Sequence, residues 1–427
     1  MPRSALDVET LLLPPAALHE AGRFDEALQQ YQALAATAAH SPLYWNNFGN
    51  TLLELGRFQE ACESYRQALA FDETLLDTRV ALATCLQMLR CYDESRQQCE
   101  QVLERCPDHA EARWNRSLLL LMQGDYLQGW QEYEWRWRKR NFTSPRRTFS
   151  SPEWQREPLA GKRILVYGEQ GFGDVIQFAR YLPLLVDQGA VVTLECHGPL
   201  VTLMGSVRGI TAVPFGSGES VSHDCNAPLL SLPRLLGAAC STIPAVLPYL
   251  QAPSRLQAFW SGALPRRCAG AMRVGLCWRG KNYPDPQRSC PESLLSPLGV
   301  VRGVEYISLQ ADRSGTPAGL PCLDLACLLD DFAETAAVIM QLDLVLTIDT
   351  VIAHLAGALG KETWVMLPYS PDWRWGATGD ITPWYPQARL FRMEHQHDWC
   401  GVIATVSACL QQHADAVLRS GPKAENP

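Results

Sequence analysis

The sequence predicts an all-α array of helical hairpins followed by an α/β region with two successive parallel-sheet halves. Small and aromatic residues recur every 34 residues over the first part of the chain. Two later segments, near 163–174 and 344–360, each combine a short apolar strand, a tight turn and a helical pattern. The length of 427 residues is compatible with two to three domains.

The repeat is defined by four columns of residues that keep their spacing over four units. The glycine column ends the first helix of each hairpin, where a left-handed backbone costs glycine little. The aromatic residue two positions later begins the second helix, and a small residue lets the two helices pack closely. The third unit departs from the pattern at Arg90 and Ser95. The four columns are Gly22, Gly56, Arg90 and Gly124; Phe24, Phe58, Tyr92 and Tyr126; Ala27, Ala61, Ser95 and Gly129; and Tyr31, Tyr65, Cys99 and Tyr133.

This period and these columns resemble the tetratricopeptide repeat, a helix–turn–helix unit. The resemblance implies about four units over residues 1–140, with a groove of the kind that binds extended peptides. A rigid spacer or a dimerisation element is an equally open role for so short an array. Asn46, Asn47 and Asn50 could hydrogen-bond a peptide backbone, or could be solvated surface.

Composition excludes several classes of protein. The net charge of -8 and the pI of about 5.7 argue against a nucleic-acid partner. The local basic run from Arg136 to Arg147 is expected to be a solvated linker first, and a site for an acidic partner second. No apolar stretch is long enough for a membrane span, and the N-terminus lacks a leader pattern. The 15 cysteines lack paired spacing, which indicates reduced thiols and a cytoplasmic protein. His395, His397 and Cys400 match no zinc spacing, so no metal is expected.

The first α/β half is expected over residues 162–262, after a linker at 141–161 that is rich in Ser, Pro and Arg. A buried strand at Arg163–Tyr167 runs into the glycine turn of Gly171 and Gly173. The third glycine of a nicotinamide-binding fingerprint is absent, which disfavours a dehydrogenase. Asp174 follows the turn at the start of a helix, where a catalytic base and a simple helix cap are equally good interpretations.

The second half is expected over residues 270–412, with a C-terminal tail at 413–427. A buried strand ends in Asp349 and Thr350 and turns directly into a helix of small residues. The free amides of such a helix, aided by its dipole, form an anion site suited to a diphosphate. Thr350 and His354 lie four positions apart and share a helix face. The alternative is a plain strand–helix unit in which Asp349 or Thr350 only caps the helix.

Residues 171–183 (GFGDVIQFARYLP) and 349–360 (DTVIAHLAGALG) resemble two motifs of glycosyltransferase family nine, the heptosyltransferase-like family. Residues 371–375 and 382–386 resemble the members of that family that are fused to tetratricopeptide repeats. The resemblance implies a GT-B fold, in which two Rossmann-like domains face a cleft. It also implies residue roles, with Asp174 as the base that deprotonates the acceptor. The remaining expected site residues are Gly171, Gly173 and Gln177 in the acceptor-side loop, and Arg279, Lys281, Arg288, Asp349, Thr350, His354, Trp373 and Arg374 around the donor.

The function expected from these observations is an inverting, metal-independent glycosyl transfer without a cofactor. The donor would be an ADP- or UDP-sugar, and the repeats would recruit a protein or glycan acceptor or a partner. Classical heptosyltransferases lack the repeat array, so their lipopolysaccharide acceptor is not carried over. The alternative is a non-catalytic tetratricopeptide scaffold with a degenerate transferase domain.

Overall fold

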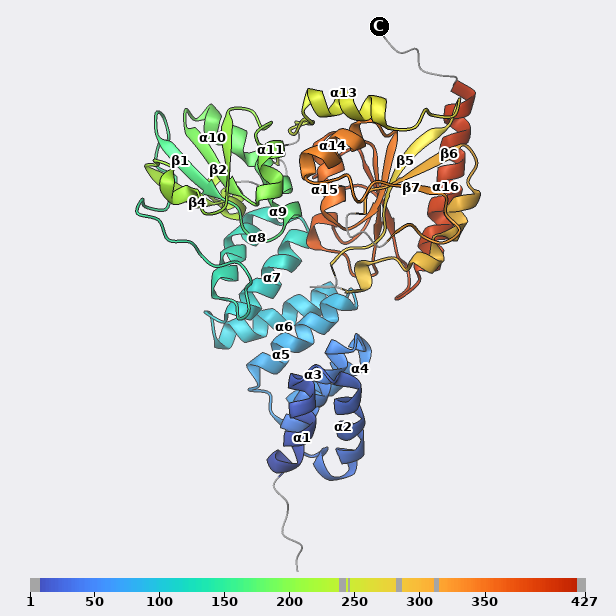
Figure 1. The fold of residues 1–427 in the computed structure, drawn as a ribbon. Coiled ribbons are helices and arrows are strands. Elements are labelled where there is room, and N and C mark those ends of the chain that lie inside the picture. The colour runs from blue at the N-terminus through green and yellow to red at the C-terminus, as the bar shows by residue number, and fades with distance from the viewer. Residues whose placement is uncertain (1–7, 238–242, 245, 282–285, 311–314, 421–427) are drawn as a thin grey trace, which may run out of the picture. The chain divides into compact units, whose positions relative to one another are not determined.

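The computed structural model describes residues 8–237, 243–244, 246–281, 286–310 and 315–420. The chain divides into a helical array, Met1–Gln123 with Gln128–Phe142, and an α/β unit, Gly124–Leu127 with Thr143–Pro427 (Figure 1). Residues 1–7 of the predicted array and 421–427 of the predicted tail lie outside the described residues. Over the described part of the chain, no helix has both the length and the apolar character needed to cross a membrane.

The array consists of helices that pack against their neighbours in chain order, which confirms the predicted hairpins. The turn column is left-handed throughout: φ is 73° at Gly22, 72° at Gly56 and 83° at Gly124. Arg90 occupies the same position with φ 61°, so the third unit keeps the turn without its glycine. The helices are α1 (Val8–Glu20), α2 (Phe24–Ala38), α3 (Pro42–Glu54), α4 (Phe58–Phe71), α5 (Leu76–Met88), α6 (Tyr92–Arg105), α7 (Ala110–Met122), α8 (Tyr126–Tyr133) and the 3-10 helix η1 (Glu134–Arg138).

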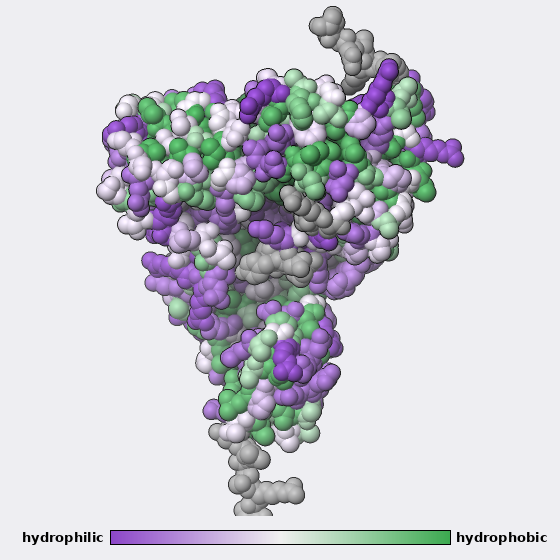
Figure 2. Space-filling view, viewed as in Figure 1, coloured by the Kyte–Doolittle hydropathy of each residue, from purple (hydrophilic) through white to green (hydrophobic). Residues whose placement is uncertain are grey.

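The array core is made by the small and aromatic columns. Ala61 and Tyr65 of α4 are fully buried, and the Tyr65 ring lies against Gly49 of α3. A Cβ at Gly49 would come within 2.7 Å of that ring, so only glycine lets α3 and α4 approach this closely. Hydrophilic and hydrophobic residues are interspersed on the visible surface of the array (Figure 2). Because the column residues are buried between the helices, their burial holds successive hairpins together.

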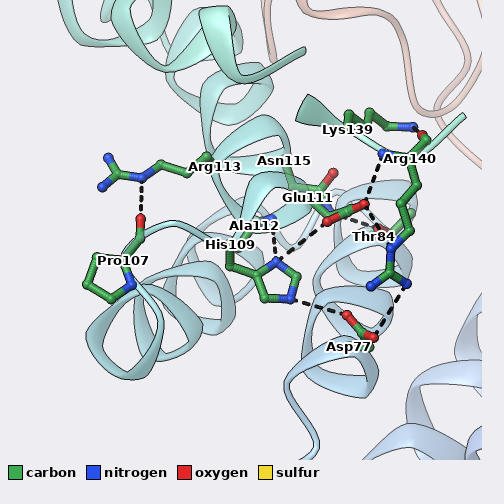
Figure 3. A network of polar contacts seen from close by, with 10 residues as sticks. All are labelled: Asp77, Thr84, Pro107, His109, Glu111, Ala112, Arg113, Asn115, Lys139 and Arg140. Atoms are coloured by element: carbon green, nitrogen blue, oxygen red, sulfur yellow. Dashed lines mark hydrogen bonds and ion pairs between the residues drawn. The ribbon is translucent and has the colours of Figure 1, made fainter. Parts of the chain in front are cut away.

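A polar network joins α5, the start of α7 and the residues after η1 (Figure 3). His109 caps α7 by accepting from the Ala112 amide, and its Nε2 lies 3.2 Å from the Asp77 carboxylate. The Arg140 amide donates to Glu111 at 3.1 Å, and its guanidinium lies 3.6 Å from Asp77. Earlier in the predicted basic run, Arg136 is fully buried and stacks over the Trp137 ring at 4.5 Å. That run is therefore not a uniformly solvated linker.

The first half of the α/β unit is a four-stranded parallel sheet in the order β3-β2-β1-β4. The central strand β1 (Arg163–Tyr167) is buried and pairs with both β2 and β4. The apolar run near 229–232 also predicts a strand, but this prediction is wrong by a few residues, because β4 ends at Pro228 and a short 3-10 helix follows. The other strands of this sheet are β2 (Val191–Cys196), β3 (Ile210–Pro214) and β4 (Cys225–Pro228).

The second half is a six-stranded parallel sheet in the order β10-β9-β8-β5-β6-β7. Its central strand β8 (Leu344–Ile348) is buried along its whole length, as expected for a parallel strand covered on both faces. The sequence also predicts a helix from about Phe332 to Met340, and helix α14 (Phe332–Met340) has these bounds. The other strands are β5 (Met272–Cys277), β6 (Val304–Ser308), β7 (Cys322–Asp324), β9 (Thr363–Leu367) and β10 (Ala388–Arg392).

Three segments differ from the predicted boundaries. Part of the expected linker 141–161 packs on the first sheet, since Trp154 is buried and its amide donates to the Asn226 carbonyl at 2.8 Å. Helix α13 (Ser254–Ala263) packs on α14 of the second half, where the Trp260 indole donates to Glu334 at 2.5 Å. Helix α16 (Trp399–Ser420) continues into the expected tail. In the first two cases a single tryptophan is buried by the neighbouring element.

Candidate active site

Two strand–helix turns meet at the centre of the candidate site. Helix α9 (Phe172–Phe178) follows β1, and α15 (Val351–Ala358) follows β8, so each begins at the carboxyl end of its sheet. The two helices pack directly on each other. A Cβ at Gly173 would lie 2.8 Å from Cδ2 of His354, so glycine is needed for this approach. The glycine turn therefore brings together backbone segments of the two halves of the unit.

Asp174 lies in the first turn of α9 and makes two polar contacts. Its Oδ2 accepts from the Gly171 amide at 2.9 Å, as a helix-capping carboxylate does. Its Oδ1 pairs with the guanidinium of Arg374 from the second half. Burial raises the pKa of Asp174, whereas the Arg374 charge and the Gly171 amide act in the opposite direction. The capping interpretation is therefore correct for one oxygen, and the base interpretation stays a prediction.

Arg374 is a polar connection between the two halves, rather than an open donor ligand. Its Nε donates to Gln177 at 2.6 Å and its Nη1 donates to Asp372 at 2.8 Å, in addition to the pair with Asp174. The Arg374 side chain is 10% exposed and stacks over Trp373, with its Cζ 4.5 Å from the ring centroid. The sequence assigned Arg374 and Trp373 to the donor and Gln177 to the acceptor loop. The structure joins Arg374 to Gln177 directly and buries all three residues.

His354 is buried on the inner face of α15. Its Nδ1 lies 2.9 Å from the Tyr385 hydroxyl, and its ring stacks on Trp375 with the centroids 5.5 Å apart. Burial, with a smaller contribution from Arg374 and Arg180, lowers the pKa of His354 well below its usual range. The ring is therefore neutral at pH 7. These contacts favour the prediction that His354 orients α15 over a direct contact with a phosphate.

The start of α15 lies beside the basic turn that follows β5. Thr350 caps the helix, its hydroxyl accepting from the Ile352 amide at 3.3 Å. Gly280 lies between two of the predicted residues: a Cβ there would be 3.1 Å from Nε of Arg288 and 3.3 Å from Cγ2 of Thr350. The Arg288 guanidinium donates to the Lys281 carbonyl at 2.9 Å, which fixes this cation next to the helix start. The structure thus brings Arg288 and Thr350 together, as a phosphate site would require.

Three further predicted residues differ in burial: Asp349 at the start of the helix, and Arg279 and Lys281 in the basic turn. Burial, with the neighbouring Asp372, raises the pKa of Asp349 to about 6. Arg279 is 35% exposed and lies 3.5 Å from Glu292, and Lys281 is exposed. The amide of Gln310 holds the turn by accepting from the Arg279 amide at 3.1 Å and donating to its carbonyl at 3.0 Å.

Four residues that organise the site are not predicted from the sequence as site residues. Asp372 and Tyr385 lie inside the motif segments 371–375 and 382–386, so the motif was the available signal. Arg180 lies within the motif segment 171–183; its guanidinium is buried and donates to the Trp384 carbonyl at 2.8 Å. No local pattern marks Gln310, because its partners are about 30 positions away. Within the described ranges, no cluster of three or more His, Cys, Asp or Glu could hold a metal ion.

Family models of the tetratricopeptide repeat match residues 42–75 and 86–128. The helical array is a tetratricopeptide-repeat region. A curated relative, protein FlbA of Caulobacter vibrioides, is 25% identical over 96% of this chain and 73% of its own length.

Two solved structures resemble the α/β unit. One is a family 9 glycosyl transferase of Veillonella parvula, which is 12% identical. The match covers 62% of this chain and 99% of that chain, with a TM-score of 0.45. The other is the Escherichia coli ADP-heptose lipopolysaccharide heptosyltransferase II, which is 14% identical. The match covers 60% of this chain and 99% of that chain, with a TM-score of 0.44. The two parallel sheets themselves agree with the predicted architecture.

In the tetratricopeptide array, the three asparagines of α3 bind within the array. The Asn46 side chain accepts from Thr78 of the next hairpin at 2.7 Å, and Asn50 accepts from the Tyr65 hydroxyl at 2.8 Å. Asn47 accepts from Asn46 at 3.1 Å. Two of the three asparagines thus link α3 to α4 and α5, so neither a free peptide-binding ladder nor a simple solvated surface describes them.

Proposed function

We propose that the α/β unit is a glycosyltransferase that uses a nucleotide-sugar donor. The single observation that carries the proposal is the contact between α9 and α15, at which Gly173 lies against His354. The candidate base Asp174 is the next residue after Gly173, and Thr350 caps the helix that carries His354. Both motifs of the family resemblance lie in these two segments. A base on one half and an anion site on the other are what transfer from a sugar diphosphate to a hydroxyl requires.

The proposed donor is an ADP- or UDP-sugar bound at the start of α15. Its diphosphate would accept from the first free amides of that helix and pair with Arg288, Arg279 and Lys281. No metal and no cofactor is part of the proposal, because the basic side chains supply positive charge where the leaving diphosphate gains negative charge. Trp373 and Arg374 take a positioning role in this scheme, since both are buried against residues of the unit itself.

The proposed reaction is a single inverting displacement. Asp174 takes the proton of the acceptor hydroxyl as the acceptor oxygen bonds to the anomeric carbon, and the bond from that carbon to the diphosphate oxygen breaks. The nucleoside diphosphate leaves with its electron pair, stabilised by the cations beside Thr350. The raised pKa of Asp174 favours proton uptake, but its pair with Arg374 must loosen for the carboxylate to reach the substrate. The repeats would recruit the protein or glycan acceptor, or a partner.

Thermal stabilisation by ADP, UDP, GDP, CDP and NAD tests the donor proposal. A ligand at about 100 times its dissociation constant stabilises the folded state by about 2.7 kcal/mol, which gives a measurable rise in Tm. We expect one nucleoside diphosphate to act selectively, and Arg288→Met with Thr350→Val to abolish the shift. Arg255→Met, a change at an exposed residue of α13, is the matched control. No shift with any nucleotide would contradict the proposal.

A transfer assay with the identified donor then tests the base. We expect Asp174→Asn to lower kcat by about 100-fold or more while donor binding is kept, since a general base contributes on this scale. Unchanged turnover in Asp174→Asn would remove Asp174 from the mechanism.

A second candidate function is a non-catalytic scaffold in which the repeats bind partners and the transferase unit is inactive. The observation in its favour is the ion pair that occupies the Asp174 carboxylate. The two candidates differ in the nucleotide experiment, because a scaffold without a donor site gives no selective shift.

A further inference from the structure

Residues 143–154, part of the expected linker, cross one face of the first sheet, and we call this segment the strap. Arg147 of the strap pairs with Glu195 of β2. The ring of Phe149 lies 5.4 Å from the ring of Tyr167 in β1, measured between the centroids. Tyr167 and Glu195 are partners in the register of the two strands, so their side chains share one face of the sheet. The strap therefore covers this face near the carboxyl ends of β1 and β2.

The pair of Arg147 with Glu195 is a buried anchor of the strap. The Glu195 side chain is fully buried, and its Oε1 also accepts from the amides of Gly216 at 2.8 Å and Gly218 at 2.7 Å. A buried carboxylate needs such partners, because an ionised group without them is strongly disfavoured in a protein interior. At the far end of the strap, Trp154 is buried beside β4. The strap thus has a fixed path on the α/β unit, to which it belongs.

Ser144 of the strap contacts the glycine turn that follows β1. Its Oγ accepts from the Gln170 amide at 2.7 Å. Gln170 has a left-handed backbone with φ 62°, a conformation that costs free energy for a residue with a side chain. The next residue, Gly171, donates its amide to Oδ2 of Asp174 at 2.9 Å. Ser144 therefore supports the backbone conformation of the turn that binds the Asp174 carboxylate.

We propose that Ser144 is a positioning residue for the candidate base Asp174. The inference rests on the proposed function, because a base has a role only if the unit transfers a sugar. Without the Ser144 hydroxyl, the Gln170 amide loses this acceptor and the turn can relax toward a right-handed backbone. The Gly171 amide would then move, and the Asp174 carboxylate with it, away from the geometry that proton transfer requires. The strap would in this way be part of the transferase, although it precedes both family motifs in the sequence.

Steady-state kinetics of the full chain, with the donor identified by the Tm shift, test this role. Ser144→Ala removes the hydroxyl, and we expect kcat to fall about three- to tenfold while the donor KM and the nucleotide Tm shift stay unchanged. Ser144→Thr keeps the hydroxyl and should restore kcat. Ser150→Ala, the same change at an exposed residue of the strap, is the matched control and should leave kcat unchanged.

Hydrogen exchange provides a readout that does not depend on turnover. We expect a peptide that contains Gln170 to exchange faster in Ser144→Ala than in the unaltered chain or in Ser150→Ala, because the amide has lost its acceptor. Unchanged exchange or unchanged kcat in Ser144→Ala, an equal fall of kcat in Ser150→Ala, or no recovery in Ser144→Thr would overturn the proposal.

The nucleotide Tm shift separates this proposal from the proposed function. The shift depends on the second sheet, whereas Ser144 acts on a turn of the first sheet. A selective nucleotide shift and sugar transfer, together with an unchanged kcat in Ser144→Ala, would contradict only the positioning role. The absence of any nucleotide shift would contradict the proposed function itself and the positioning role with it.

Discussion

The contacts inside the helical array and those inside the α/β unit differ in how far apart the bonded residues lie in the sequence. In the array, Asn46 binds Thr78 and His109 binds Asp77, and in both pairs the two residues are 32 positions apart, close to one repeat. In the α/β unit, one of the contacts that join the halves pairs Asp174 with Arg374, 200 positions further along the chain. The contacts of the array therefore link neighbouring hairpins, whereas those of the site link segments that are far apart in the sequence. The predictions below test this difference.

The largest expected effect is that of Arg374→Met. The change leaves the Asp174 and Asp372 carboxylates without their partner at a largely buried position, which we expect to destabilise the α/β unit by about 3 kcal/mol or more. Chemical denaturation with peptide-resolved hydrogen exchange over β1 and β8 measures this loss. The control is Arg163→Met, which breaks the exposed pair with Asp224 and should cost far less, because solvent screens exposed ion pairs. Equal losses in the two variants would show that Arg374 is not a special connection.

The pH dependence of stability provides a second test of the same region. The pKa of Asp349 is raised to about 6, above its value of about 3.9 in an unfolded chain. The folded state therefore binds more protons between these values, and this group makes the free energy of unfolding fall as pH rises from about 4 to 6. We expect Asp349→Asn to remove a fall on the order of 2 kcal/mol. Asp224→Asn is the control, since the pKa of Asp224 is lowered to about 2, outside this window. An unaltered slope in Asp349→Asn would contradict the expected shift.

Gly357→Ala tests the packing of α15. A Cβ at this position would lie 2.3 Å from Cδ1 of Tyr385, the partner of His354, so we expect a loss of about 1.5 kcal/mol. Gly262 in α13 has open space around it, and Gly262→Ala should stabilise the protein by about 0.5–1 kcal/mol. Thermal melting of the two variants compares them. A stabilising Gly357→Ala would mean that the Tyr385 ring moves away freely.

The smallest expected effect lies in the array. Arg90→Gly relieves a left-handed arginine and should stabilise the third hairpin by about 0.5–1 kcal/mol. Gly56→Ala places a side chain at the equivalent turn of the second hairpin and should cost a similar amount. The midpoint of urea unfolding, followed by circular dichroism, measures both changes. If the two changes act in the same direction, the turn column does not set hairpin stability.

The sequence predicts the array well because each hairpin repeats the same pattern of turn, small and aromatic residues. The columns that include Gly56, Tyr65 and Arg90 are enough to locate the helices and their left-handed turns. Central strands such as β1 and β8 are also predicted, since a buried parallel strand is a continuous apolar run. Short strands are harder, as β4 shows, because a proline-containing apolar segment fits a strand or a turn equally well.

The contacts within the candidate site are less predictable. The motifs point to Asp174, Arg374 and His354, but they do not reveal that Arg374 binds Asp174 or that His354 binds Tyr385. These partners come from opposite halves of the unit, so no helical or strand period relates them.

The contacts of Arg180 bear on how easily the two halves of the α/β unit could separate. Its buried guanidinium donates to the Tyr249 hydroxyl and the Trp384 carbonyl, and lies 4.9 Å from the Tyr385 ring centroid. The cation is thus solvated by the second half and by the segment that connects the halves. Separating the halves would exchange these contacts for water, and the guanidinium would pass through a state in which neither set of partners is complete, so we expect opening to have an activation barrier of its own. For the glycosyl transfer proposed above, this barrier would act on product release rather than on bond making.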